Sequence, residues 1–230
     1  FIALINEKAA QAEKMGEDYA DLKDNLDKKA EPLQAAYDAE QWTREEINAA
    51  VDNQSVYDMV AEAVKPAMKA GDDVTIVMNN SNYSWGTANW AGSFTARANT
   101  AEKWHASFDV NQTIANMPKG AYTLKFKGFQ RHDTNDEGEV GQHEALVYAN
   151  ESAKLLIECG DDAEVVPSSM ETAREAFDNG LFENEFAFVL KEAGDLKIGV
   201  KGTNGLNWVI WSDFQLIYNG AGVATMAAAV

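Results

Sequence analysis

The sequence predicts a mainly β protein with an N-terminal α-helical part, in which an antiparallel jelly-roll β-sandwich follows a helical hairpin. Up to residue 71 the chain is rich in Ala, Glu, Lys and Asp, and apolar residues recur at helical spacing. From residue 72 onward, about eight short runs alternate apolar and polar residues between turn-forming stretches, as strands of sandwiches do. We therefore expect a helical unit over 1–71, a sandwich over 72–220 and a tail over 221–230.

The helical unit carries an apolar stripe on one face. Apolar residues recur every seven positions at Ile5, Ala12, Tyr19, Leu26 and Leu33, which indicates a packing face. Pro32 predicts a kink or short break. Thr43 and Glu46 form a capping-box pattern that restarts a helix, and Gly71 is expected to end the last one.

The stretch from Trp104 to Arg131 contains two alternating runs around a turn, Met117-Pro118-Lys119-Gly120. Because successive strand residues point to opposite faces, each run predicts a half-buried strand. Proline and glycine suit a tight turn. We expect a two-strand antiparallel unit whose apolar face a second sheet covers, with Trp104 and Trp211 both in the core.

The charge of the chain limits its partners. The 230 residues carry a formal net charge of −18. A negative field repels phosphate backbones and anionic lipid surfaces, so neither nucleic acid nor a membrane surface is an expected partner. The sequence has no apolar run near the ~20 residues that span a bilayer. The single cysteine, Cys159, allows no intramolecular disulfide and suits a small buried thiol.

Motifs for catalysis are missing from the sequence. The three histidines, His105, His132 and His143, lack zinc-site spacing, and neither a nucleophile elbow nor a phosphate-binding loop occurs. Carboxylates are abundant, but nothing singles out a glycosidase pair. We therefore expect no enzyme, with a glycoside hydrolase or lyase as the least favoured alternative.

Aromatic residues in polar loops are the best signal of a binding site. Tyr83 and Trp85 lie in the stretch NNSNYSWGTANW, and Arg131 and His132 end a strand before a polar loop. Sugars stack their C–H faces on aromatic rings and need polar partners for their hydroxyls. These four residues are the predicted ligand contacts. In the rival interpretation, the aromatic residues only fill the space between the sheets.

Oxygen donors that could serve calcium are scattered over several segments: Asp72, Asp73, Asn79, Asn80 and Asp213. Calcium takes six to eight such ligands, yet no EF-hand spacing is present. Alternatively, the asparagines make Asx turns and Asp213 anchors a backbone amide. A structural calcium is left open, and no metal ligand is assigned.

The order of several segments resembles a known family. The segments NNSNYSWGTANWAGS, AEKWHASFDVNQTI, MPKGAYTLKFKGFQR and WVIWSDFQLIY, over about residues 73–219, resemble the galactose-binding-domain-like β-sandwich of exported or lipid-anchored gut-bacterial proteins, which is similar to carbohydrate-binding modules. The resemblance implies sugar binding by loops at one end of the sandwich, often with a structural calcium. Because the chain starts at Phe1 inside a helical pattern, we also expect a removed signal segment and a periplasmic or cell-surface location.

Two functions follow from these observations. The first is non-catalytic binding of a glycan or oligosaccharide by loops at one end of the sandwich, in an exported or cell-surface protein. The alternative is a structural spacer or protein-interaction module of a surface assembly, without a small-molecule ligand and with protein partners at the helical part. Exposure of the loop aromatics beside a concavity would favour the first function, and their burial the second.

Overall fold

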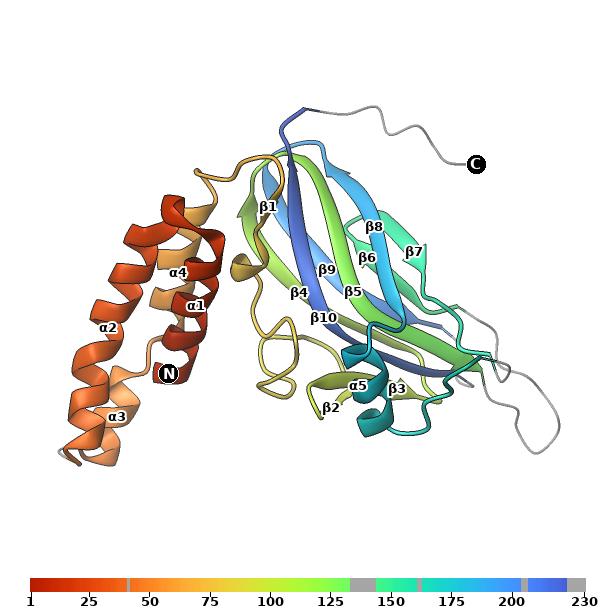
Figure 1. Ribbon diagram of the computed structural model, residues 1–230, viewed down its shortest axis with the longest axis horizontal. Coiled ribbons are helices and arrows are strands. Elements are labelled where there is room, and N and C mark those ends of the chain that lie inside the picture. Colours follow the sequence, from red (N-terminus) through yellow and green to blue (C-terminus); the bar gives the residue numbers. More distant parts are fainter. Residues whose placement is uncertain (41, 133–143, 161–162, 204–206, 223–230) are drawn as a thin grey trace.

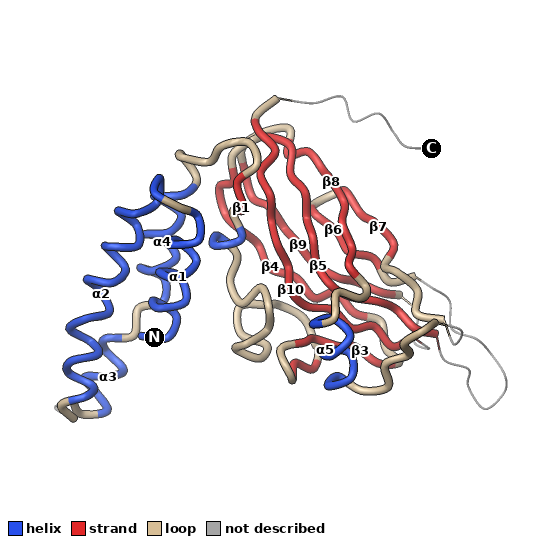
Figure 2. The backbone as a smooth tube through the Cα atoms, in the orientation of Figure 1, coloured by secondary structure: helices blue, strands red, loops and turns tan. Residues whose placement is uncertain are grey.

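The N-terminal helices and the two sheets occupy separate regions of the molecule (Figure 1, Figure 2). The computed structural model describes residues 1–40, 42–132, 144–160, 163–203 and 207–222. The predicted fold class is confirmed, since two antiparallel sheets follow an N-terminal helical part. The exact division at residues 71 and 220 stays a prediction, and residues 223–230 of the expected tail lie outside the described residues. No helix among the described residues is long and apolar enough to cross a membrane.

The helical unit contains four α-helices. α1 (Ile2–Met15) and α2 (Ala20–Asp38) form the hairpin, joined by the 3-10 turn η1 (Glu17–Tyr19), and α3 (Arg44–Ala50) and α4 (Asn53–Val64) follow. The Thr43–Glu46 capping box is present as predicted. Two details differ from prediction. α2 runs through Pro32 without interruption, and α4 ends at Val64 rather than near Gly71.

The first sheet, sheet A, has the strand order β2-β3-β10-β5-β8, with β1 paired to β10. Its strands are β1 (Asp72–Asp73), β2 (Thr95–Arg97), β3 (Thr100–Trp104), β5 (Gly120–His132), β8 (Glu183–Leu190) and β10 (Asn207–Gly220). β1 is short, because a 3-10 turn, η2 (Thr75–Val77), follows it closely.

The second sheet, sheet B, has the order β4-β9-β6-β7. Its strands are β4 (Phe108–Met117), β6 (Leu146–Ala149), β7 (Ser152–Leu155) and β9 (Gly194–Gly202). The two inner faces bury a common core that includes Val110, Leu124, Val200, Trp211 and Phe214. The core assignment of Trp211 is confirmed, since none of its surface is exposed.

The predicted hairpin between residues 104 and 131 is wrong. β4 pairs with β9 in sheet B, whereas β5 pairs with β10 and β8 in sheet A. The Pro118–Gly120 turn therefore carries the chain from one sheet to the other. The turn between β8 and β9 does the same, so that pair is not a hairpin either. The apolar faces of these strands still meet, but across the sandwich.

A short helix, α5 (Met170–Asp178), covers part of the outer face of sheet A (Figure 1). Ser169 caps it in a capping box with Thr172. Met170, Ala173 and Phe177 pack on a second, smaller core that includes Phe129, Cys159, Trp208 and Ile210. As expected from the sequence, Cys159 is a buried thiol.

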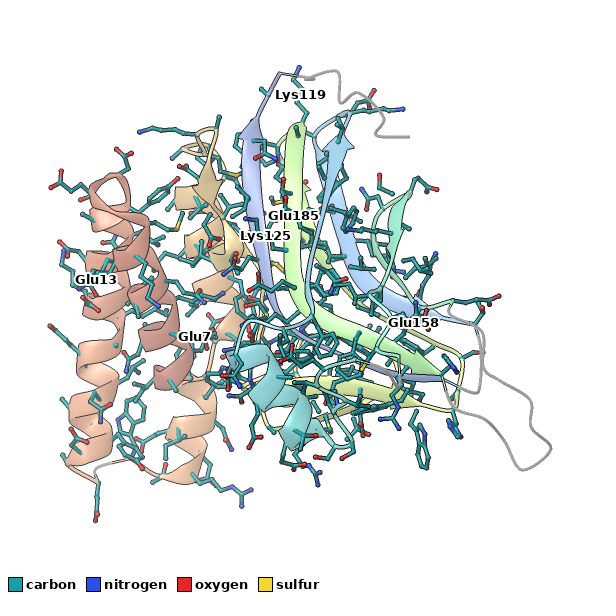
Figure 3. The ribbon with its side chains drawn as sticks, turned by 45° about the vertical axis from the view of Figure 1, so that its right-hand side comes forward. Glu7, Glu13, Lys119, Lys125, Glu158 and Glu185 are labelled. Carbon is teal, nitrogen blue, oxygen red and sulfur yellow. The ribbon has the colours of Figure 1, made fainter. Side chains whose placement is uncertain are left out.

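Contacts between side chains and the backbone hold the helical unit against the sandwich. The ammonium group of Lys8 on α1 is buried and donates to the carbonyl oxygens of Ile76 (2.7 Å) and Met78 (2.6 Å). The indole of Trp85 donates to Glu7, which Figure 3 places between the helical unit and the sandwich. The helical unit is therefore docked on the sandwich.

Candidate functional site

Three neighbouring strands of sheet A place a row of large side chains on its outer face. In the strand register, Trp208 of β10 lies opposite Trp104 of β3 on one side and Arg131 of β5 on the other. Residues opposite each other on adjacent strands point to the same face and lie about 5 Å apart. The sequence positions are far apart, but the sheet aligns them.

This row lines a pocket of about 350 Å³, completed by Glu102, Ser168 and Ser169. The Trp208 ring is 8% exposed, and its Nε1 donates to Glu102 Oε2 at 2.8 Å. Trp104, by contrast, is 63% exposed. The Trp104 ring lies 4.5 Å from the His105 ring, measured between centroids. A large exposed ring beside a pocket offers apolar surface to a ligand.

Arg131 and the segment before α5 form the other side of the pocket. The guanidinium carbon of Arg131 lies 5.9 Å from the centre of the Trp208 ring, and its Nη1 donates to the Pro167 carbonyl at 2.8 Å. Stacking and this hydrogen bond orient the guanidinium group. The Ser168 and Ser169 hydroxyls follow directly in the chain. The pocket thus combines an aromatic surface with charged and hydroxyl hydrogen-bonding groups.

An ion pair holds α5, and with it the Ser168–Ser169 side of the pocket. Arg174 of α5 donates to both carboxylate oxygens of Asp213, at 3.0 and 2.8 Å. Asp213 lies at a β-bulge of β10 with φ 53°, which turns its side chain toward α5. Burial alone would raise the pKa of Asp213, but the hydrogen bonds and charges of Arg174 and Lys127 outweigh it and lower that pKa.

Replacing Arg174 with methionine is expected to lower the free energy of unfolding by about 1–3 kcal/mol, because the Asp213 carboxylate loses the nearer of its two charged partners and keeps only Lys127, at 3.5 Å. The pKa of Asp213 is depressed in the folded state, so the pair stabilises the fold above the usual pKa of 3.8 and loses this effect as pH falls below it. Urea unfolding of both proteins at pH 6 and pH 3 should show the difference shrinking at pH 3. An equal difference at both pH values would contradict this role.

The structure places only one of the four predicted ligand contacts in the pocket, and that residue is Arg131. His132 follows it on β5 and so points to the other face, where its Nδ1 lies 3.6 Å from Glu158 Oε1. The structure does not bring Tyr83 and Trp85 to this pocket, because both lie near the helical unit and the core. The four residues do not form one site.

Tyr83 occupies the sandwich core rather than the surface. It is 2% exposed, and its hydroxyl accepts a hydrogen bond from Trp211 Nε1 at 2.6 Å. Its ring packs against Trp90 and Phe94. Burial raises the pKa of Tyr83 well above its usual value. In this position the ring stabilises the core and has no surface to offer a ligand.

Trp85 serves the contact between the helical unit and the sandwich. Its ring is 39% exposed, and its Nε1 donates to Glu7 Oε2 at 2.7 Å. Neighbouring Asn80 fixes this loop, since its side chain accepts from the Trp85 amide and donates to the carbonyl oxygens of Gly86 and Ala88. A direct role of Trp85 in ligand binding stays a prediction.

The sequence interpretation missed Trp104, which it assigned to the core. Trp104 has the parity of Phe108 and Val110, but β3 ends at Trp104 and the chain bends before β4 begins in the other sheet. His105 adopts φ 46° in this bend, so alternation does not continue across it. The polar residues after Trp104 were a signal that the strand stops there.

Four of the five side chains considered for calcium have other partners, and the hydrogen bonds of one of them, Asn80, are described above. Asp72 accepts from the Tyr19 hydroxyl and the Lys69 amide, and Asp73 accepts from the Thr75 amide. The Asp213 carboxylate forms an ion pair with Arg174, whereas the sequence interpretation had it anchor a backbone amide. Within the described ranges, no three His, Cys, Asp or Glu residues are grouped to hold a metal ion.

No family model matches the chain. No curated protein matches it either. Solved structures that match include a module described as CBM4 (12% identity, TM-score 0.38, 61% of this chain and 98% of that one). A second is TmCBM61 in complex with beta-1,4-galactotriose (15% identity, TM-score 0.34, 61% of this chain and 97% of that one). A third is the CBM22-1 xylan-binding domain from Paenibacillus barcinonensis Xyn10C (9% identity, TM-score 0.39, 67% of this chain and 99% of that one).

These structures are carbohydrate-binding modules, the class that the sequence resemblance named. A gut-bacterial origin is not tested by them. Because the TM-scores lie below 0.5, the matches assign neither a ligand nor a binding residue to this chain.

Proposed function

We propose that the chain binds a glycan, without catalysing a reaction on it, in the pocket formed by Trp104, Trp208, Arg131, Glu102, Ser168 and Ser169. The exposure of Trp104 beside this pocket is the observation that carries the proposal. An indole face suits the C–H face of a sugar ring, and the remaining groups suit its hydroxyls. Ligand pockets commonly combine such an apolar surface with a few placed polar groups.

A non-catalytic role agrees with the chemistry of the pocket. Glu102 is the only carboxylate among the described residues that line it, whereas glycosidases use two carboxyl groups facing each other across the scissile bond. Glu102 is also occupied by the Trp208 indole. Export to the periplasm or cell surface remains part of the proposal, and fractionation of cells that express the full-length protein would test it.

Replacing Trp104 with alanine is expected to weaken glycan binding at least tenfold, since the stacking surface is removed. A panel of soluble polysaccharides and oligosaccharides, screened by affinity electrophoresis and calorimetry with and without calcium, identifies the ligand for this comparison. Because Trp104 is largely exposed, the variant should unfold at the same temperature as the original protein.

Trp85→Ala is the matched control, because Trp85 is also partly exposed but lies at the helical unit. It should bind the glycan as tightly as the original protein. If Trp85→Ala abolishes binding and Trp104→Ala does not, the site lies in the 79–90 loop. Failure of the protein to bind any member of a broad panel would contradict glycan binding.

A specific observation favours the structural alternative. Tyr83 and Trp90 are buried, and Trp85 contacts α1, so this loop joins two parts of the molecule. A spacer or interaction module would use such a docked helical unit. Under that alternative the Trp104 pocket has no ligand, and neither variant changes any binding measurement.

A further inference from the structure

An apolar groove lies on the helical unit, between the start of α1, the end of α2, and α3. It has a volume of about 430 Å³, and its lining includes Ile2, Leu33, Tyr37, Trp42, Ile47 and Val51. Tyr37 is 66% exposed, Ile47 41% and Val51 47%. Contiguous exposed apolar surface of this kind is typical of an interaction site. We call it the helical groove.

Helix α3 adds an independent observation. It has seven residues, and none of them is buried. Helices owe most of their stability to tertiary packing of an apolar face, and one as short as α3 is marginal without it. The Thr43 capping box holds its first turn, but Ile47 is 41% exposed in the described structure. A partner that fills the helical groove would supply that packing.

The charge around the helical groove indicates the chemistry of the partner. From Glu31 to Asp58 the sequence holds seven acidic residues and one basic residue, Arg44, a net charge of −6. All seven acidic side chains belong to exposed residues. The lining of the groove contains no Asp or Glu, so we use the name acidic rim for the exposed carboxylates of these neighbouring segments. An apolar groove with such a rim is complementary to a helix that has one apolar and one basic face. A second copy of the chain would bring two such acidic rims together, which is unfavourable.

We propose that the helical groove binds a basic amphipathic helix of a partner protein. The apolar face of that helix packs on Ile47, Val51 and Tyr37, and its lysines or arginines face the acidic rim. This interaction does not depend on the glycan pocket, which lies on the outer face of sheet A. The full chain can therefore be tested for both activities separately.

The test uses a labelled 18-residue peptide of leucine and lysine, with leucine at i, i+3, i+4 and i+7 spacing. Fluorescence anisotropy should show saturable binding to the full 230-residue protein. Ile47→Asp should weaken binding at least tenfold, whereas Leu155→Asp, which changes an equally exposed apolar residue on β7, should not. Asp38→Asn with Glu40→Gln, which changes two exposed acidic residues next to the lining residue Tyr37, should weaken binding severalfold and reduce its salt dependence. Trp104→Ala should leave binding unchanged.

Three outcomes would overturn the proposal. The first is absence of binding to the amphipathic peptide. The second is equal binding of an isomer with the same composition but without an apolar face, since this would show only charge attraction. The third is a concentration-dependent dimer in sedimentation velocity that Ile47→Asp abolishes, because a second copy would then occupy the helical groove. Circular dichroism of each variant verifies that the helices remain folded.

Discussion

Replacing Lys8 with methionine should lower the free energy of unfolding by about 1–3 kcal/mol at pH 9, and the loss should grow as pH rises further. Lys8 is 1% exposed, and its ammonium group donates to the carbonyl oxygens of Ile76 and Met78. Methionine has a similar length but no donor, so both carbonyl groups lose their partner. The contact between α1 and η2 should loosen first.

The pH dependence follows from the burial of this lysine. Burial lowers the pKa of Lys8 from 10.5 to about 8, against the opposing effect of Glu7. Between these values the unfolded chain holds a proton that the folded chain has released, so raising the pH stabilises the fold. The methionine variant lacks this gain. The difference in stability between the two proteins should therefore grow by about 1.4 kcal/mol per pH unit between pH 8 and pH 10.

Urea unfolding at pH 7, 8, 9 and 10 measures this difference. Tyrosine ionisation at high pH affects both proteins equally and cancels. Lys14→Met is the control, because Lys14 is an exposed lysine on the same helix. It should change stability by less than about 1 kcal/mol at each pH. A flat difference between Lys8→Met and the original protein would refute the role of a buried charge.

Replacing Gly92 with alanine should lower the free energy of unfolding by about 3 kcal/mol or more. Gly92 adopts φ 107°, which side-chain-bearing residues rarely adopt, and an added Cβ would lie 2.3 Å from the Asp109 carbonyl oxygen. That oxygen belongs to β4, which cannot move without disturbing its pairing with β9. The destabilisation by backbone strain and that by the steric clash therefore add in this variant.

Gly71→Ala separates these two effects. Gly71 has a similar φ of 98°, but an added Cβ meets nothing within 4 Å. Gly71→Ala should therefore lower the free energy of unfolding only by the cost of the unfavourable backbone conformation, about 1–2 kcal/mol. Thermal and urea unfolding of both variants measure the difference. Equal losses would show that the close approach to β4 is relieved by small shifts.

The sequence predicted correctly those features that depend only on residues close together in the chain. The capping box at Thr43 is an example, since it uses groups three residues apart. Periodicity also identified the mainly β part, because burying one face imposes alternation on each strand.

Long-range pairing was not readable from the same signals. The Pro118–Gly120 turn is equally suitable for a hairpin and for a crossing between sheets, because the turn residues do not specify the partner strand. For the same reason the Trp104–Trp208–Arg131 row was not foreseen, since the order β3-β10-β5 creates it. Tyr83 lies in a polar segment, yet its ring enters the core beneath Trp211. The composition of a segment can predict that it forms a loop, but it does not predict which way a single side chain in that loop points.

The docking of α1 on the sandwich has a consequence for simultaneous binding. Lys8 and the Trp85–Glu7 hydrogen bond fix the orientation of the helical unit, so the helical groove and the Trp104 pocket keep a constant separation. A flexible tether would let two occupants find each other at many distances. Under the two proposals, a glycan in one site and a partner helix in the other would be held at one spacing. The chain would raise the effective concentration of the partner only at a defined distance from the glycan.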